Sequence, residues 1–373
     1  MDNTDKKALH KQRMYAALNN EKADKAPVVI MGPIPCAKYA DRNIVAADAV
    51  ERPEYFLDKA FDGLDLLKYV DSIQGFSSAL SRTKGLTFMA NTKLPGVEIE
   101  RDAMIQIEEI PHMEKEEYSR LIEKGWGEYK KYYIDSFINV TPEDFEKSKR
   151  FKSYAVNKIS ESEYYEWSGG ASPMPWDLLT AMRGMTTFFR DLRKDPEMIK
   201  QAMAAIDIEE GKMLDGGIKA FDPDKAFSIM VQPGVRSNCS FVSRKVFEEF
   251  VWPYVQKYAD KLIDANIPVH FHYDSKWDDF LDLFTYFPKN KCIMDTDGMT
   301  DIYKVKEILG RRMAITGNVS ASMLSLDTPE EVYAFTKKQL NDIGPEGYII
   351  CSSCTIPSNC KPENLQAMVE ACQ

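Results

Sequence analysis

The sequence contains no apolar run approaching the roughly 20 residues that a bilayer-spanning helix needs. Its N-terminus is polar and helical in pattern, and it lacks the apolar core of a secretory signal peptide. Acidic residues outnumber basic ones, 58 against 48, and the formal net charge of −10 argues against nucleic acid or an anionic membrane surface as a partner. We therefore expect a cytoplasmic protein with no membrane or nucleic-acid partner.

A disulfide framework is also missing. The seven cysteines are an odd number, and three of them, Cys351, Cys354 and Cys360, lie close together near the C-terminus. This pattern is typical of reduced thiols in a cytoplasmic protein rather than of a disulfide-bonded secreted domain.

No glycine-rich dinucleotide-binding loop follows the first expected strand, residues 26–31, which disfavours a doubly wound open sheet. From residue 226 onward, short and continuously apolar strands alternate with helices, as in a parallel sheet that is buried on both faces. A chain of 373 residues with 44% hydrophobic residues can bury one large core. We therefore predict an α/β fold, a (β/α)8 TIM barrel, with a single domain over residues 1–373.

Several segments add to the expected barrel. Residues 1–25 predict an N-terminal helical extension on the surface. Residues 113–165 are highly charged and aromatic, and their pattern predicts a helical insertion or lid. Residues 166–171 predict a strand that ends in a glycine turn, and residues 277–284 predict a helix.

Histidine is scarce, with four residues in the chain, and two of the four stand in one expected strand, residues 267–274. Because side chains alternate along a strand, His270 and His272 point to one face, and Asp274 continues that face. Any one of these residues alone is more often a hydrogen-bonded core or cap residue than a metal ligand. The three residues predict a metal site only if a further ligand joins them.

A barrel brings the carboxyl ends of all its strands to one rim, where barrel enzymes keep their active sites. Polar or thiol side chains follow several of the expected strands. The candidates at this rim are Gln232, His272, Asp274, Asp295, Asp297, Asn318 and Cys354.

Four motifs in the C-terminal half are RMAITGNV at 312–319, LDTPEEV at 326–332, YIICSSCTIP at 348–357 and KPENLQAM at 361–368. FEEFVWPY at 247–254 and Arg183-Gly184 precede them. In order and spacing these motifs resemble the uroporphyrinogen decarboxylase superfamily, over residues 170–373 and only weakly before them. The fold of that superfamily is a (β/α)8 barrel, in agreement with the interpretation of the strand pattern.

The true decarboxylases carry an arginine-rich stretch after the first strand, and it binds the carboxylates of the porphyrinogen. In this chain residues 31–39 contain no arginine, and the next one is Arg42. A substrate with eight carboxylates is poorly matched without that cluster. Asp71 lies near the position of a catalytic aspartate of the decarboxylases, and a strand-end or cap residue is at least as good an interpretation.

The other branch of the superfamily contains the corrinoid-linked methyltransferases. Its thiol-methylating members bind zinc through a His-x-Cys pair at the end of this strand and a second cysteine at the end of the last strand. The resemblance implies that His272, Asp274 and Cys354 are the metal ligands here, with Asp274 in place of a thiolate. The alternative ligands are His270, Cys351 and Cys360.

The exchange of a thiolate for a carboxylate gives a harder, more Lewis-acidic zinc, which suits the polarisation of an ether oxygen. The predicted function is therefore O-demethylation. In this reaction a methyl group moves from a methoxylated, aromatic small molecule to the cobalt(I) of a separate corrinoid protein. The chain has no Asp-x-His-x-x-Gly motif of its own, so the cobalamin-type cofactor must arrive on that partner.

The residues predicted to act in catalysis are His272, Asp274, Gln232 and Asn318. Three other functions remain open at this stage: a methylcobamide:thiol methyltransferase of the coenzyme M type, a porphyrinogen decarboxylase, and a non-catalytic metal- or corrinoid-binding relative. The direction of methyl transfer and the oligomeric state also remain open, with a homodimer as one option.

Overall fold

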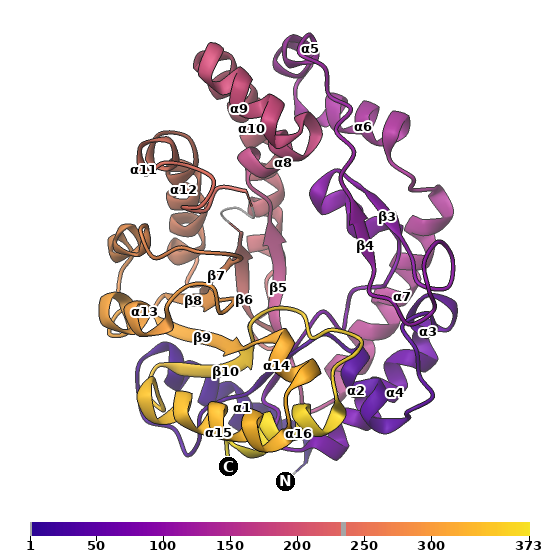
Figure 1. Cartoon of the computed structure of the whole chain (residues 1–373), viewed down its shortest axis with the longest axis vertical. Coiled ribbons are helices and arrows are strands. Elements are labelled where there is room, and N and C mark those ends of the chain that lie inside the picture. Colours follow the sequence, from indigo (N-terminus) through magenta and orange to yellow (C-terminus); the bar gives the residue numbers. More distant parts are fainter. Residues whose placement is uncertain (1, 233–235) are drawn as a thin grey trace.

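The computed structural model of the chain describes residues 2–232 and 236–373, and it confirms the predicted TIM barrel (Figure 1). Eight parallel strands follow one another in the order β1-β2-β5-β6-β7-β8-β9-β10, and a bridge between Val28 and Ile350 joins the last strand to the first. The barrel strands are β1 (Val29–Met31), β2 (Ser72–Gln74), β5 (Glu166–Ser172), β6 (Ala226–Val231), β7 (Val269–Tyr273), β8 (Cys292–Thr296), β9 (Ala314–Val319) and β10 (Tyr348–Ser352).

Side chains alternate between the barrel interior and the surrounding helices. Val29 and Met31 belong to a buried cluster inside the barrel, together with Trp167 of β5. Their neighbours Val28 and Ile30 belong to the larger cluster between strands and helices. Both faces of each strand are therefore buried, which explains why the strands read as continuously apolar.

The helices surround the strands (Figure 1), and none of those described is long and apolar enough to cross a membrane. They are α1 (Asn3–Leu18), α2 (Ile34–Ala40), α3 (Asp48–Glu51), α4 (Pro53–Leu67), α5 (Glu117–Lys124), α6 (Trp126–Phe137), α7 (Pro142–Glu161), α8 (Pro175–Arg183), α9 (Met185–Lys194), α10 (Pro196–Ala220), α11 (Arg244–Val246), α12 (Trp252–Asp264), α13 (Ile302–Leu309), α14 (Ala321–Leu326), α15 (Pro329–Asp342) and α16 (Pro362–Glu370). Short 3-10 helices η1 (Arg82–Phe88) and η3 (Leu281–Tyr286) and a π-helical turn η2 (Phe247–Val251) complete the set.

The N-terminal helix α1 closes the end of the barrel at which the strands begin. Met14, Ala17 and Leu18 are buried against the interior cluster, which includes Val29 and Ile349 from strand starts. The helix predicted over residues 1–25 is therefore present, but it is shorter, and one of its faces is buried rather than on the surface.

The predicted helical segment at residues 113–165 forms α5, α6 and α7. An antiparallel ribbon of β3 (Asn91–Lys93) and β4 (Gln106–Glu108) precedes it in the chain. Helix α7 begins with a capping box, in which Thr141 and Asp144 satisfy each other's backbone N–H groups. Movement of this segment as a lid stays a prediction.

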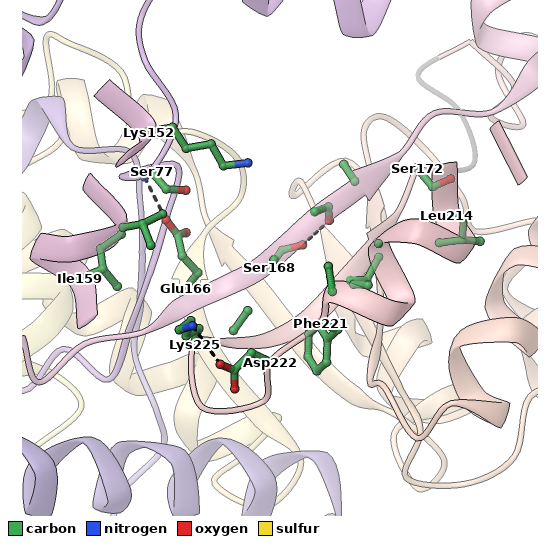
Figure 2. A pocket seen from close by; sticks show the side chains of 18 of the residues that line it. Ser77, Lys152, Ile159, Glu166, Ser168, Ser172, Leu214, Phe221, Asp222 and Lys225 are labelled. Carbon is green, nitrogen blue, oxygen red and sulfur yellow. Dashed lines mark hydrogen bonds and ion pairs between the residues drawn. The ribbon is translucent and has the colours of Figure 1, made fainter. Parts of the chain in front are cut away.

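Strand β5 does not end in the predicted glycine turn. It continues through Gly169 and Gly170 to Ser172, and its register against β6 shifts between Ser168 and Ala171. Glycine in a strand often marks such a bulge, so the glycines here serve a strand irregularity rather than a turn. A groove of about 510 Å³ runs along this strand between α7 and α10 (Figure 2).

The helix predicted over residues 277–284 is also wrong in type. Turns follow Trp277, and a 3-10 helix, η3, begins only at Leu281. The Trp277 ring lies 4.2 Å from the Tyr273 ring, and its Nε1 donates to the carbonyl of Asp274 at 2.8 Å. These contacts hold the chain against β7 in place of a helical turn.

Asp71 lies directly before β2, at the end of the barrel opposite to the carboxyl ends of the strands. It is fully buried and accepts hydrogen bonds from Arg13 Nη1 at 2.8 Å and from the Val28 N–H at 3.0 Å. Lys25 Nζ lies 3.3 Å from the same carboxylate. Asp71 therefore ties α1 to the barrel, and the interpretation of this residue as a catalytic aspartate is disfavoured.

We predict that Asp71→Ala lowers the free energy of unfolding by about 3–5 kcal/mol, because it leaves the buried Arg13 guanidinium without its buried partner. Urea unfolding measures this loss. Asp24→Ala is the matched control, since Asp24 also pairs with Arg13 but is exposed, and it should cost about 1 kcal/mol or less. Normal stability together with lost turnover in Asp71→Ala would restore the catalytic interpretation.

Candidate metal centre

Two histidines of β7 face the barrel interior. Both side chains are buried, His270 completely and His272 with 7% of its surface exposed. Val269, which precedes His270, and Phe271, which lies between the two histidines, face the helices. The alternation of the strand therefore places the two imidazoles on one face, as the sequence predicts.

A carboxylate of the neighbouring strand binds both histidines. In the parallel register of β7 and β8, His272 lies directly beside Asp295. Asp295 Oδ2 lies 2.6 Å from His272 Nδ1 and 2.9 Å from His270 Nε2, and the carboxylate is fully buried. The contact between Asp295 and His272 Nδ1 leaves Nε2 of the same ring free to face the mouth of the barrel.

Two further donor groups lie beside His272 Nε2. Asp274 Oδ1 is 3.5 Å away, and Cys354 Sγ is 3.9 Å away. Asp274 follows the end of β7, and Cys354 follows the end of β10. The structure thus brings together the three residues that the sequence predicts as ligands, although their binding of a metal stays a prediction.

The spacing of these three groups fits a tetrahedral zinc ion. Zn–N and Zn–S bonds of about 2.0 and 2.3 Å place neighbouring ligand atoms about 3.3–3.5 Å apart. The ligand atoms of His272, Asp274 and Cys354 all lie within 4.8 Å of one another, so small side-chain adjustments suffice. Asp274 is 31% exposed, which leaves one side of the group open for a fourth ligand.

A second cluster, formed by His270, His272 and Asp295, meets the same distance criterion. Its nitrogen-to-oxygen distances of 2.6 and 2.9 Å match hydrogen bonds and are shorter than the edge of a zinc tetrahedron. All three side chains are buried, so the cluster leaves no open position. This geometry suits Asp295 to the orientation of His272 rather than to metal binding, as in carboxylate–histidine–metal arrangements.

The electrostatics of the group follow from this contact. Burial disfavours the charged form of His272, but the Asp295 charge and the hydrogen bonds of Asp274, Asp295 and Cys354 outweigh it and raise the pKa of His272 well above its usual value. Burial would raise the pKa of Asp295, yet the His272 charge and the bonds of both histidines hold it below its usual value. Metal binding must displace a proton from His272, so metal affinity falls as the pH falls.

The alternative cysteine ligands are less suitable. Burial raises the pKa of Cys351 well above its usual value, and its sulfur contacts Thr316 Oγ1 at 3.1 Å inside the barrel. Burial also raises the pKa of Cys360, to about 12. Among the described residues, only Cys354 of these three cysteines belongs to a group of ligand atoms that lie within 4.8 Å of one another, so Cys354 remains the best thiolate candidate.

Gln232 and Asn318 lie at the carboxyl ends of other strands of the barrel. Gln232 lies at the end of β6 and lines a cavity of about 400 Å³ beside the mouth. Asn318 lies in β9, with 9% of its surface exposed, and its Oδ1 has no hydrogen-bond partner among the described residues. Their predicted catalytic roles stay predictions.

Two polar residues near the centre have roles that the sequence does not predict. Asp295 is one of the rim candidates, but its contact with His272 depends on the register between β7 and β8. Asp177 lies in the first turn of α8 and accepts the backbone N–H of Arg236 at 3.2 Å. Burial, together with the charge of Asp274, raises the pKa of Asp177 to about 7.

Comparison with known proteins places the chain in a family. Residues 167–373, more than half of the sequence, match the family model described as uroporphyrinogen decarboxylase. The chain belongs to the uroporphyrinogen decarboxylase family. In a sequence search, no curated protein matches it.

Two solved structures are similar to this family member. A methyltransferase from Methanosarcina mazei superposes with a TM-score of 0.63 at 16% identity, over 97% of each chain. A B12-independent methionine synthase from Shewanella sp. W3-18-1, in complex with selenomethionine, gives a TM-score of 0.47 at 12% identity, over 93% of this chain and 97% of the other. At this identity the first likeness shows a common fold, and no argument rests on the second.

We predict that purified protein binds one zinc ion per chain, and that His272→Ala and Cys354→Ser each abolish stoichiometric binding. The physical reason is that either change leaves only two of the three donors. Metal analysis after dialysis measures the content, and binding should weaken from pH 8 to pH 6. Cys351→Ser serves as the control and should retain full zinc, and full zinc in Cys354→Ser would instead exclude Cys354 as a ligand.

We also predict that Asp295→Asn weakens zinc binding about 10- to 100-fold, the range for loss of a partner that orients a ligand. The amide can no longer act as a charged acceptor for the His272 N–H. Competition with a chromogenic chelator measures the affinity. An unchanged affinity would show that Asp295 has no part in orienting His272.

Proposed function

We propose that the protein is a zinc-dependent methyltransferase that moves a methyl group from a methoxylated aromatic compound to the cobalt(I) of a separate corrinoid protein. The O–CH3 bond of the ether would break with its electron pair left on the oxygen as a phenolate, and the electron pair of cobalt(I) would form the new bond to the methyl carbon. The observation that carries this proposal is the His272–Asp274–Cys354 group at the mouth of the barrel. It combines the histidine and cysteine expected from the thiol-methylating relatives with a carboxylate in place of their second thiolate.

His272 Nε2, Asp274 Oδ1 and Cys354 Sγ would hold the metal, and Asp295 would keep the His272 ring in the orientation and tautomer that this requires. Zinc would supply Lewis-acid activation of the ether oxygen, and a carboxylate ligand favours this activation more than a second thiolate does. The exposed side of Asp274 leaves room for the oxygen of the substrate.

The cavity beside the mouth supports a small substrate. Its volume of about 400 Å³ lies in the range of small-molecule sites and suits a single substituted ring. Among its described lining residues Lys84 alone carries a positive charge. A porphyrinogen, with four pyrrole rings and many carboxylates, would be poorly matched in both size and charge.

The methyltransferase with the same fold, from Methanosarcina mazei, adds support at the level of reaction type. The corrinoid is expected on a partner protein, because the sequence has no corrinoid-binding motif of its own. Helices α5 and α6 of the insertion could flank the docked partner and move on its arrival.

The deciding experiment combines the zinc-loaded protein with a reconstituted cobalt(I) corrinoid protein and a panel of methoxylated aromatic compounds. Methyl-cobalt formation, followed by its absorbance, should depend on the protein, stop with a chelator and return with zinc. Release of carbon dioxide from a porphyrinogen without metal would indicate a decarboxylase. Methylation of a thiol, without demethylation of any methoxylated compound, would indicate the thiol-methylating reaction. The absence of any methyl transfer would indicate a binding protein.

We predict that Asp274→Cys keeps one zinc per chain but lowers the demethylation rate by about 10²-fold or more. Removal of one electrostatic contact to a transition state lowers the rate of an enzyme by a factor of this size. A second thiolate donates more charge to the metal and weakens its action on the ether oxygen. Zinc content, melting temperature and rate are measured on the same variant.

Asp297→Asn is the matched control for that variant. Asp297 also follows a barrel strand, but its carboxylate accepts the backbone N–H groups of Ser275 and Met299 and is not among the candidate ligands. This control should lose stability of about 1 kcal/mol, as for the loss of a cap, with little change in rate. Unchanged turnover and lowered stability in Asp274→Cys would make Asp274 a cap residue as well.

A further inference from the structure

The cavity of about 400 Å³ lies at the same rim of the barrel as the candidate metal centre. Its floor is formed where strands end, by Gly32 after β1, Gln74 of β2, Gln232 after β6 and Thr355 after β10. Thr355 is the neighbour of Cys354, and consecutive Cα atoms lie 3.8 Å apart. Cys354 Sγ lies 3.9 Å from His272 Nε2 while Thr355 lines the cavity, so a ligand that extends past Thr355 would approach the metal donors.

The walls of the cavity are apolar and come from the N-terminal half of the chain. The main contributors are Phe56, Leu80, Phe88, Met104, Ile105 and Phe151. Phe56 and Phe151 are buried, and the other four are half-buried around the opening. Three aromatic rings and three branched or flexible side chains suit a flat, apolar ring of the ligand.

One cation interrupts this apolar wall. Lys84 of η1 lines the cavity and donates a hydrogen bond from Nζ to Ser78 Oγ at 2.6 Å. Among the described residues, no carboxylate lies within 4.0 Å of Lys84 Nζ, and the described lining of the cavity contains no acidic residue. Burial lowers the pKa of Lys84, and the nearby charge of Glu166 only partly offsets this.

A half-buried ammonium without a direct ion pair is costly in the empty cavity, because it has lost water and Glu166, whose charge acts on it, does not pair with it within 4.0 Å. A carboxylate on the ligand would restore the pairing with a charge-assisted hydrogen bond. A neutral ligand of the same shape would instead bury Lys84 further with no compensation. On this argument the cavity would favour an anionic compound over a neutral one of equal size.

We propose that the methyl donor is an anion, a methoxylated aromatic carboxylate, and that Lys84 selects it by pairing with the carboxylate while the apolar wall holds the ring. This inference rests on the proposed function for the identity of the reacting methyl group. Lys84 lies outside residues 167–373, which match the family model, so the family alone does not assign this role.

Ligand binding to the zinc-loaded protein tests the proposal without any corrinoid. The probes are 4-methoxybenzoate and its neutral analogue 4-methoxybenzamide, titrated by calorimetry. Wild-type protein should bind the benzoate more tightly, and Lys84→Met should weaken benzoate binding about 10-fold or more, as for loss of a hydrogen bond to a charged group. Benzamide affinity should change little.

Two further variants keep the result interpretable. Lys84→Arg retains the charge and should keep most of the preference for the benzoate. Lys289→Met removes one positive charge from an exposed position just before β8, at the opposite end of the barrel, and should behave as wild type. A benzoate affinity that is equal in Lys84→Met and wild type would overturn the proposal, because the carboxylate would then bind elsewhere, for example directly to zinc.

Demethylation assays separate this inference from the proposed function. Equal demethylation of both probes by wild type and Lys84→Met would leave the function standing and show the role of Lys84 to be wrong. Benzoate binding that depends on Lys84 without any methyl transfer would support the anion site and contradict the proposed function. Benzoate-selective demethylation that falls with Lys84→Met would support both.

Discussion

The register between β7 and β8 is the constraint on which the candidate centre depends. Because the two strands are parallel and His272 lies beside Asp295, their side chains meet on one face inside the barrel. The 2.6 Å contact between them fixes one nitrogen of the ring and turns the other toward Asp274 and Cys354. A shift of one residue in either strand would point the side chain of His272 or of Asp295 into the helix layer, and the contact between them would be lost.

Much of this could be predicted from the sequence, and the reason is the period of a strand. Alternation places His270 and His272 together, and the common rim of a parallel barrel gathers Asp274 and Cys354 from β7 and β10. The sequence places Asp295 at a strand end but does not predict its contact with His272. That contact depends on the register between two strands, which is set by tertiary packing.

Other features escaped prediction for local reasons. The glycines of β5 have the composition of a turn, but they accommodate a bulge inside a strand. The helix expected after Trp277 is replaced by turns, because the indole ring packs on Tyr273. No sequence pattern predicts that Lys84 lines a cavity. A single lysine in a 3-10 helix has the same sequence context whether its side chain faces water or a cavity. Its position follows from the packing of η1 beside the mouth.

Two buried aspartates show how the end of the barrel determines the role of a residue. Asp71 and Asp295 are both completely buried and both pair with basic side chains. Asp71 precedes its strand and pairs with Arg13 at the end of the barrel opposite to the metal donors, so its effect is expected on stability. Asp295 lies at the end of its strand and contacts His272, whose other nitrogen faces Asp274 and Cys354, so its effect is expected on metal binding.

The cavity and the metal donors come from different parts of the chain. His272, Asp274, Asp295 and Cys354 all belong to the segment from β7 to β10, whereas nearly all of the cavity wall comes from residues 32–151. In evolutionary terms, the two parts can change separately. Substitutions, insertions or deletions in the N-terminal segment could alter which compounds enter without touching the residues that hold the metal, so that one reaction centre could serve a succession of substrates.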